Sequence, residues 1–280
     1  MKEKNQLIQK VKHLLKKASM PRYLHHFGPK MYQLWQHIFA LFFKADCKLS
    51  YRRTSKILRN LGFEVASKST LQRYASKLKI PFWRRIFNLT IGKCSSIFSI
   101  DGTGLEKTCA SKHYIKRIDS PYKFGKGFHF SIVVDKKGKI QGLRLRKKHG
   151  SDVKDIKNLF KNLINKPKVI LMDKGYDAEW IHELFEKTGI KSIAPTRKNA
   201  RRGFYRRKLM KKFPQKLYNK RNIVESIFHA FKQKYGSNIF SKNITSARSE
   251  VYCKAILHNI FLKITKVLGH TPSLSKIYIG

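Results

Sequence analysis

The stretch YNKRNIVESIFHAFK, from Tyr218 to Lys232, organises the chain. On a helix, at about 100° per residue, its polar residues fall on one stripe and its apolar residues on the other side. The stripe carries Tyr218, Arg221, Glu225 and Lys232. Taken alone, it indicates a surface helix with an Arg–Glu pair at i, i+4, worth a few tenths of a kcal/mol. The residues expected to face a core are Ile223, Val224, Ile227, Phe228, Phe231 and Tyr235.

The charge of the chain points to a polyanionic partner. The 280 residues include 62 Lys and Arg against 16 Asp and Glu, a net charge of +46. With 41% hydrophobic residues the chain can bury a substantial core, which excludes a disordered basic tail. Residues 1–96 carry +18 and residues 97–280 carry +28, so both parts are basic. We therefore expect binding along duplex DNA, with an anionic membrane surface as the rival partner.

The lack of a targeting signal in the sequence and the wide spacing of its cysteines favour a cytoplasmic, nucleoid-associated protein. The N-terminal stretch lacks the apolar core of a signal peptide, and no apolar run reaches 18 residues. Cys47, Cys94, Cys109 and Cys253 share no close spacing, so neither a zinc site nor a disulfide framework is indicated. Reduced thiols fit the cytosol, and no membrane segment is expected.

Residues 50–78 are typical of a helix-turn-helix. Two amphipathic segments flank Gly62, and Ser69 is placed to cap the second helix. Ser69, Gln72 and Arg73 then become candidates for contacts in a DNA groove. An ordinary helical hairpin is the alternative. We assign residues 1–94 to a helical N-terminal domain.

From Ser96 onward the periodicity indicates a mixed α/β sheet. Strand-like runs and a hairpin come first, and strands alternate with helices afterwards. The expected strands are 96–100, 127–135, 139–147, 169–173 and 191–195. The expected helices are 152–163, 178–187, the helix of the opening stretch, and 246–267. Residues 197–220 are expected to form a basic loop without further structure.

Two apolar strands each end in an aspartate, Asp101 and Asp173. An aspartate at the end of a strand often caps the following turn, which is the alternative reading of each. Together with Glu225, however, they form a set of three acids in a chain that nearly excludes acids. Three converging carboxylates can hold two divalent ions about 4 Å apart and activate a water or a 3′-hydroxyl toward a DNA phosphate. Mg²⁺ suits such oxygen ligands.

The spacing Tyr218, two residues, Arg221, three residues, Glu225, six residues, Lys232 resembles the third-acid motif of DDE transposases of bacterial and archaeal insertion sequences. The stretches IDGTG around Asp101 and MDKGYDAEW around Asp173 also resemble the first and second acid blocks of that family.

The resemblance implies a ribonuclease-H-like catalytic domain over residues 95–268, followed by a tail at 269–280. It implies that Asp101, Asp173 and Glu225 bind two Mg²⁺ or Mn²⁺ ions. The enzyme would be an endonuclease and strand transferase that binds terminal inverted repeats, cuts the ends of its element and joins the 3′-hydroxyls to target DNA. Because two ends must be cut together, we expect a homodimer on paired ends.

Further residues are assigned supporting roles. Arg221 and Lys232 are expected to bind phosphates near the cut end, and Tyr218 to stack on a base, to donate to a phosphate or simply to pack at the start of the helix. Asp152 is expected to cap a helix, with a supporting role at the site as an alternative, and Asp177 to cap another. The basic loop is expected to clamp the DNA backbone. The residues of this loop that are expected to contact DNA are Arg201, Arg202, Arg206 and Arg207.

Two other functions fit the same residues. A DNA-binding protein that kept the scaffold without catalysis would neither bind metal at the acids nor cut strands. A structure-selective nuclease of the same fold would cut DNA but would yield no joined products.

Overall fold

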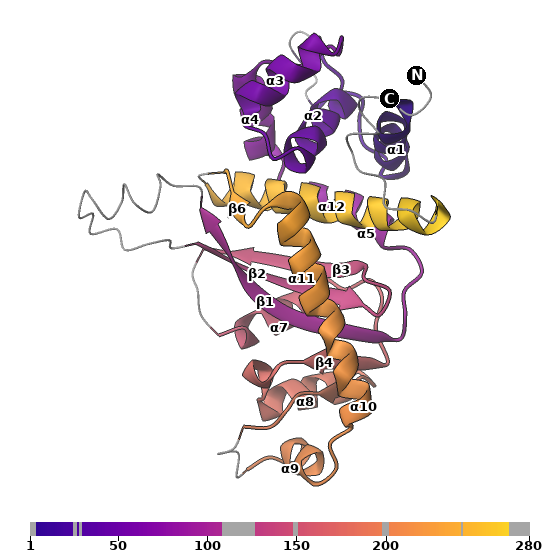
Figure 1. Ribbon diagram of the computed structural model, residues 1–280, viewed down its shortest axis with the longest axis vertical. Helices are drawn as coiled ribbons and strands as arrows, with labels where there is room; N and C mark the ends of the chain where they lie inside the picture. Colours follow the sequence, from indigo (N-terminus) through magenta and orange to yellow (C-terminus); the bar gives the residue numbers. More distant parts are fainter. Residues whose placement is uncertain are drawn as a thin grey trace, which may run out of the picture. The chain divides into compact units, whose positions relative to one another are not determined.

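The computed structural model describes residues 4–24, 27, 30–107, 127–147, 151–197, 202–241 and 243–268. The chain forms two compact units, which are described separately (Figure 1). The first combines residues 1–92 with residues 234–280, and the second is residues 93–233. Arg201 and the predicted tail at 269–280 lie outside the described residues.

The first unit is mainly helical. Long α12 packs against α2, α4 and α5, so the C-terminal helix joins the N-terminal helices into one core. Buried Trp83 of α5 donates its indole N–H to Ser249 of α12 at 2.9 Å, which satisfies a polar group inside this core. The helices are α1 (Lys4–Lys17), α2 (Leu34–Asp46), α3 (Tyr51–Asn60), α4 (Lys68–Lys77), α5 (Ile80–Ile91) and α12 (Ile244–Leu268), with the short β6 (Asn238–Ile239).

This arrangement differs from the sequence boundaries in one respect. We assigned the last helix to the domain at 95–268, whereas its contacts place α12 with the unit that contains α1–α5. The buried side of α12 meets partners that are remote in sequence, and helical periodicity alone cannot identify them. None of the helices in the described part of the chain is long and apolar enough to cross a membrane.

Two helices, α3 and α4, form where the helix-turn-helix was expected. Ser50 caps α3 by accepting a hydrogen bond from the Arg53 N–H at 3.3 Å. The chain leaves α3 through Gly62, whose φ of +78° is a conformation that favours glycine. Ser67 caps α4 through the Thr70 N–H at 3.4 Å, so the prediction that Ser69 is the cap was wrong. Ser69 lies two residues after this cap, inside the helix.

The second unit is built on a mixed sheet with the strand order β3-β2-β1-β4-β5. β1, β2 and β3 pair antiparallel, whereas β1, β4 and β5 run parallel to one another. This confirms the predicted mixed sheet with hairpin strands first and βα units after. Its elements are β1 (Ile97–Lys107), β2 (Phe128–Asp135), β3 (Ile140–Arg146), α7 (Val153–Lys161), β4 (Val169–Met172), η1 (Lys174–Tyr176), α8 (Glu179–Glu186), β5 (Lys191–Ile193), α9 (Phe204–Lys211), α10 (Gln215–Tyr218), η2 (Asn219–Arg221) and α11 (Asn222–Tyr235).

Helices cover both faces of this sheet. On one face, Ile100, Ile170 and Met172 pack in a core with side chains of α7 and α8. On the other face, the ring of Phe130 contacts Phe228 and Phe231 of α11, which runs across the strands (Figure 1). The buried side of α11 is the predicted one: Val224, Ile227, Phe228, Phe231 and Tyr235 are buried, and Ile223 is half-buried.

Two local predictions were wrong. The first strand does not end at Asp101, because its residues through Leu105 pair with β2, with Leu105 opposite Phe128. That ladder compensates for the low strand propensity of the glycines in this stretch. The segment 197–220 is not merely a loop, since it contains α9 and α10. Its charge concealed a short amphipathic pattern around the buried Leu209.

Candidate active site

Asp101 and Asp173 come from neighbouring parallel strands. The last paired residues of β1 and β4 are Ile100 and Met172, so Asp101 and Asp173 are the next residue of each chain. Because side chains alternate along a strand, both lie on the opposite side from Ile100 and Met172, which is the side of α11. The two aspartates are therefore neighbours at the point where pairing between β1 and β4 stops.

The surroundings of Asp101 are half-buried and rich in charge. Burial raises the pKa of Asp101 above its ordinary value, and the nearby carboxylates of Asp173 and Asp152 raise it further. The Gly102 N–H, at 2.8 Å from one carboxylate oxygen of Asp101, and the Arg221 guanidinium both act to lower it. Asp101 thus sits where an added cation would be favourable.

Helix α11 brings Glu225 to the same face. Glu225 lies in its first turn, and Arg221 lies directly before the helix, at the end of η2. The Nη1 of Arg221 is 3.4 Å from Oδ2 of Asp101, and its Nη2 donates to Oε1 of Glu225. One guanidinium therefore connects the first and third acids, and the charge of Asp173 also acts on it.

Tyr218 and Lys232, the other two residues of the motif, also have partners close to Asp101 and Glu225. The Arg221 guanidinium is 5.8 Å from the ring centre of Tyr218. The ammonium of Lys232 donates to Oγ1 of Thr103 at 2.6 Å, and Thr103 lies two residues after Asp101 on the same face of β1. Arg221 and Lys232 of the motif therefore both contact residues of β1, Asp101 and Thr103. Arg221 and Lys232, expected to be available for phosphates, both have partners within the protein.

The donor chemistry of this site fits divalent ions, although the three acids are not yet gathered around one point. Asp101, Asp173 and Glu225 supply the carboxylate oxygens that Mg²⁺ and Mn²⁺ prefer. Within the described ranges, no three His, Cys, Asp or Glu side chains already stand close enough to share an ion. The Arg221 guanidinium lies between Asp101 and Glu225, which accounts for their separation.

A second polar cluster lies behind Asp101, on the opposite face of β1, and sequence reasoning did not predict it. His129 of β2 places Nε2 at 2.8 Å from Asp152 and at 3.3 Å from Asp155. Hydrogen bonds that His129 donates to these two carboxylates raise its pKa to about 9. Asp152 is the N-cap residue of α7, as expected, but its side chain makes no capping hydrogen bond to that helix. The detectable signal was polar His129 and Ser131 alternating with phenylalanines in an otherwise apolar strand.

Gly102 makes this cluster possible. A Cβ on Gly102 would lie 2.9 Å from the Asp152 carboxylate and 2.9 Å from the His129 ring, closer than real Cβ contacts. The same residue donates its N–H to Asp101. Gly102 therefore links the carboxylate on one face of β1 to the histidine cluster on the other.

The basic segment before α11 is held by two acids. Asp177 forms two hydrogen bonds with the Arg206 guanidinium, at 2.8 and 2.7 Å. Glu179 accepts hydrogen bonds from the N–H groups of Tyr205 and Arg206 at the start of α9. Asp177 makes no cap bond to α8, contrary to expectation, because its carboxylate binds Arg206. Arg202 and Arg207, by contrast, are exposed.

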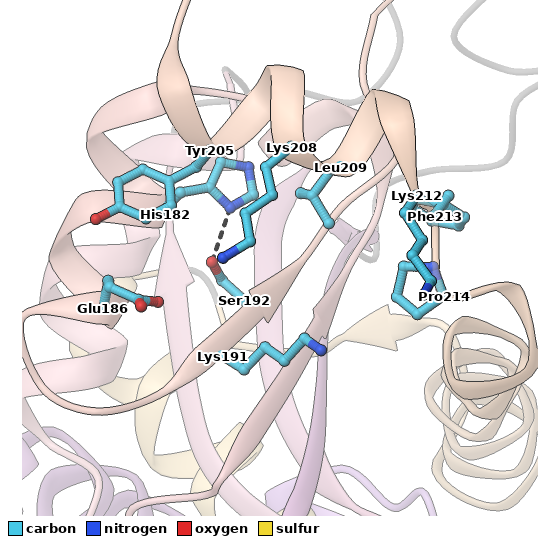
Figure 2. Close-up of a pocket in the computed structure, with 10 residues that line it drawn as sticks. All are labelled: His182, Glu186, Lys191, Ser192, Tyr205, Lys208, Leu209, Lys212, Phe213 and Pro214. Atoms are coloured by element: carbon cyan, nitrogen blue, oxygen red, sulfur yellow. Dashed lines mark hydrogen bonds between the residues drawn. The ribbon is translucent and has the colours of Figure 1, made fainter.

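A basic cavity lies beside this segment. A hollow of about 300 Å³ lies among residues of α8, β5 and the stretch 205–214. Figure 2 shows the residues that line it. Three lysines and a single carboxylate, that of Glu186, line it, with the buried hydrogen bond between His182 and Ser192 at 2.7 Å. Phe213 in its wall contacts the Tyr218 ring edge-on. Its charge suits anions, so this cavity is distinct from the acid site.

In the first unit, Ser69, Gln72 and Arg73 are all exposed on α4. Their side chains are free of the packing that fixes buried Leu71 and Ala75 on the other side of the helix. The structure therefore leaves this side of α4 accessible to a partner.

Comparisons with known proteins show the family of the chain. The family described as "Transposase DDE domain" matches residues 92–260. A probable transposase for insertion sequence element ISA1214 of Archaeoglobus fulgidus is 25% identical over 248 residues, which cover 83% of this chain and 76% of that protein. The cryo-EM structure of the piggyBac transposase synaptic complex with hairpin DNA has a TM-score of 0.53 at 13% identity, covering 98% of this chain and 76% of its own. At that identity the likeness shows the fold alone. Since the family match spans more than half of the sequence, the chain belongs to the transposase DDE domain family.

Proposed function

We propose that the protein is an active DNA transposase of an insertion sequence. It binds the terminal inverted repeats of its element, hydrolyses a phosphodiester at each end, and joins the freed 3′-hydroxyls to target DNA. Asp101, Asp173 and Glu225 are its catalytic acids. The observation that carries this proposal is the arrangement of Asp101 and Asp173 on adjacent parallel strands, with Glu225 connected to Asp101 through Arg221.

The acids would hold two Mg²⁺ or Mn²⁺ ions. When bound, the ions supply activation of the attacking water or 3′-hydroxyl and stabilise the leaving oxygen. Within the chain, the Gly102 N–H orients the Asp101 carboxylate, and the contact between Lys232 and Thr103 holds α11 along β1. Strand order and direction support a ribonuclease-H-like fold for this unit.

The DNA contacts are assigned to exposed basic side chains. Arg202 and Arg207, with Arg201, contact the backbone near the cut end. Arg206 is bound to Asp177, so we assign it the positioning of α9 rather than a phosphate contact. Lys232 and Tyr218 flank the acids and approach the DNA end from α11 and α10. Asp152 supports the site from behind through His129.

The exposed side of α4 is the proposed reader of the terminal repeats. Ser69, Gln72 and Arg73 have the donors and acceptors that recognise base edges in a major groove. Two ends must be cut and joined together, so the working form is a homodimer on paired ends, acting in the cytoplasm at the nucleoid.

The proposal is tested with purified protein, Mg²⁺ and DNA that carries the element end. Asp101→Asn, Asp173→Asn and Glu225→Gln should each lower strand cleavage and joining by at least about a thousandfold, because each removes a charged metal ligand. Glu106→Gln and Glu183→Gln remove exposed carboxylates elsewhere on this unit and serve as matched controls, with activity near that of the wild type.

Three outcomes separate the candidate functions. Cleavage and joining that are lost in the three variants support the transposase. Cleavage without joined products, on any end sequence, identifies a structure-selective nuclease. Wild-type activity in all three acid variants would contradict the catalytic assignment. DNA binding without metal binding or cleavage would favour a DNA-binding protein.

A further inference from the structure

The guanidinium of Arg221 occupies the space between two catalytic carboxylates. Its Nη1 approaches Asp101 and its Nη2 donates to Glu225, and only 13% of its side chain is exposed. In a chain with 62 basic residues, most cations lie in solvent. A half-buried arginine with both Nη atoms on acids of the proposed site is therefore a specific arrangement.

The same carboxylate oxygens have two competing uses. A guanidinium neutralises a pair of carboxylates with one charge and directional hydrogen bonds. A divalent ion brings twice the charge and needs the same lone pairs for coordination. Asp101 is half-buried, with the charge of Asp173 acting on it, so a nearby cation stabilises its carboxylate form. Arg221 and a metal ion cannot both occupy the position between Asp101 and Glu225.

We propose that Arg221 is an exchangeable counter-ion, and that it couples metal loading of the acids to the arrival of DNA. Divalent ions displace its guanidinium from Asp101 and Glu225, and the guanidinium then binds a phosphate of the DNA end. The inference rests on the proposed function of the three acids. It adds that the protein without DNA resists metal loading, because the displaced charge has no new partner.

The position of Arg221 permits this movement. It is the last residue of η2, directly before α11, so its side chain can turn without moving the helix that carries Glu225. Beside it lies the ring of Tyr218, whose face accepts a guanidinium at 5.8 Å. Because linkage is reciprocal, DNA should strengthen metal binding by the same factor as metal strengthens DNA binding.

Lys161 provides a charge control from the same unit. It is an exposed cation in the last turn of α7, the helix that packs on the other face of the sheet. Removing Lys161 deletes one positive charge without freeing a metal ligand. Only removal of Arg221 should change the competition for the acids.

The experiment measures Mn²⁺ affinity by calorimetry and by electron paramagnetic resonance, without DNA and with an uncleavable DNA end. Arg221→Gln and Arg221→Ala should bind Mn²⁺ more tightly than the wild type without DNA, by roughly five- to a hundredfold, the usual range of coupling factors. They should also lose the gain in Mn²⁺ affinity that DNA confers on the wild type. Lys161→Ala should keep that gain and show little change without DNA.

Additional variants separate the possible failures. Circular dichroism verifies folding, and Arg221→Lys, which keeps a cation, should retain part of the competition. If both neutral variants bind Mn²⁺ no more tightly than the wild type, or retain the gain from DNA, the inference is overturned. If Asp101→Asn and Glu225→Gln do not reduce Mn²⁺ binding in the wild-type background, the proposed function itself fails.

Discussion

At the scale of single residues, two acids in the last third of the chain have contrasting surroundings. Glu250 is buried in the first unit, where Lys44 and Lys254 approach its carboxylate at 3.6 and 3.3 Å. Glu225 is largely exposed, and it lies beside Arg221, its neighbour in the third-acid motif. The buried Glu250 carboxylate, between two lysines, stabilises the fold. The exposed Glu225 carboxylate can exchange partners. Only the spacing of the motif distinguished them in the sequence.

His129 should make stability depend on pH in the alkaline range. Hydrogen bonds that His129 donates to Asp152 and Asp155 raise its folded pKa to about 9 from the ordinary value of 6.5. Its stabilising contribution is therefore complete below pH 6.5 and is lost as pH rises through about 9. The shift corresponds to at most about 3 kcal/mol. The melting temperature of the wild type should fall between pH 7 and 10 more steeply than that of His129→Asn.

His229→Asn serves as the control, because His229 is exposed on α11. It should show the same pH dependence as the wild type. Equal slopes for the wild type and His129→Asn across this range would contradict the assignment of a charged His129 to the cluster.

At the scale of elements, the buried ion pair between Asp177 and Arg206 is one of the contacts that hold α9. The side chain of Asp177 is fully buried, and Arg206 satisfies both of its oxygens. Arg206→Ala would leave that carboxylate unpaired, which typically costs about 3–5 kcal/mol. Hydrogen exchange in residues 204–211 should accelerate strongly in this variant, while exchange in the strands β1 and β2 stays close to that of the wild type.

Lys211→Ala removes an exposed charge from the last turn of the same helix and is the matched comparison. Its exchange rates in α9 should remain those of the wild type. Should Arg206→Ala and Lys211→Ala exchange alike, Asp177 would not be what holds α9 in place.

The sequence predicted most elements of the sheet but not their limits. Alternating and apolar runs located β2, β3, β4 and β5, because their side chains follow the sheet period. The extension of β1 through Leu105 depends on its ladder with β2, a long-range pairing that local propensity does not encode. For the same reason α9 was hidden in a run of charges, since acids 26 to 29 residues away hold it.

The sequence proposed the acids of the candidate site but did not indicate their pairing. Asp101, Asp173 and Glu225 were chosen from strand ends and from the spacing on α11. The bridge of Arg221 to Asp101 spans 120 residues, and no local pattern indicates such a contact. The expectation drawn from the helix alone, an Arg–Glu pair at i, i+4, was confirmed, because Arg221 and Glu225 form that ion pair.

At the scale of the whole molecule, a net charge of +46 should make DNA binding strongly dependent on salt. If six to ten phosphates are contacted, affinity should fall by roughly 10³–10⁵ between 50 and 200 mM salt. The double variant Arg202→Ala, Arg207→Ala should reduce the slope of log affinity against log salt by about 2, on all sequences. Gln72→Ala with Arg73→Ala should instead weaken binding mainly to the terminal repeats.

Lys161→Ala with Lys187→Ala removes two exposed charges from other helices of the same unit and tests whether position matters. Its slope should stay within about 0.5 of the wild type if the basic segment is the contact. An equal reduction for both double variants would show that total charge, rather than the segment before α11, determines binding.

The adjacency of β1 and β4 also limits which insertions and deletions the gene can tolerate. One residue added within β4 would turn Asp173 toward the core of α7 and α8, because side chains alternate faces. Two added residues would restore the face but shift the carboxylate about 7 Å along the strand. Length changes in the loop at 162–168 leave this parity untouched. Natural length variation among functional relatives is therefore expected in that loop and not in β4 or in the part of β1 that precedes Asp101.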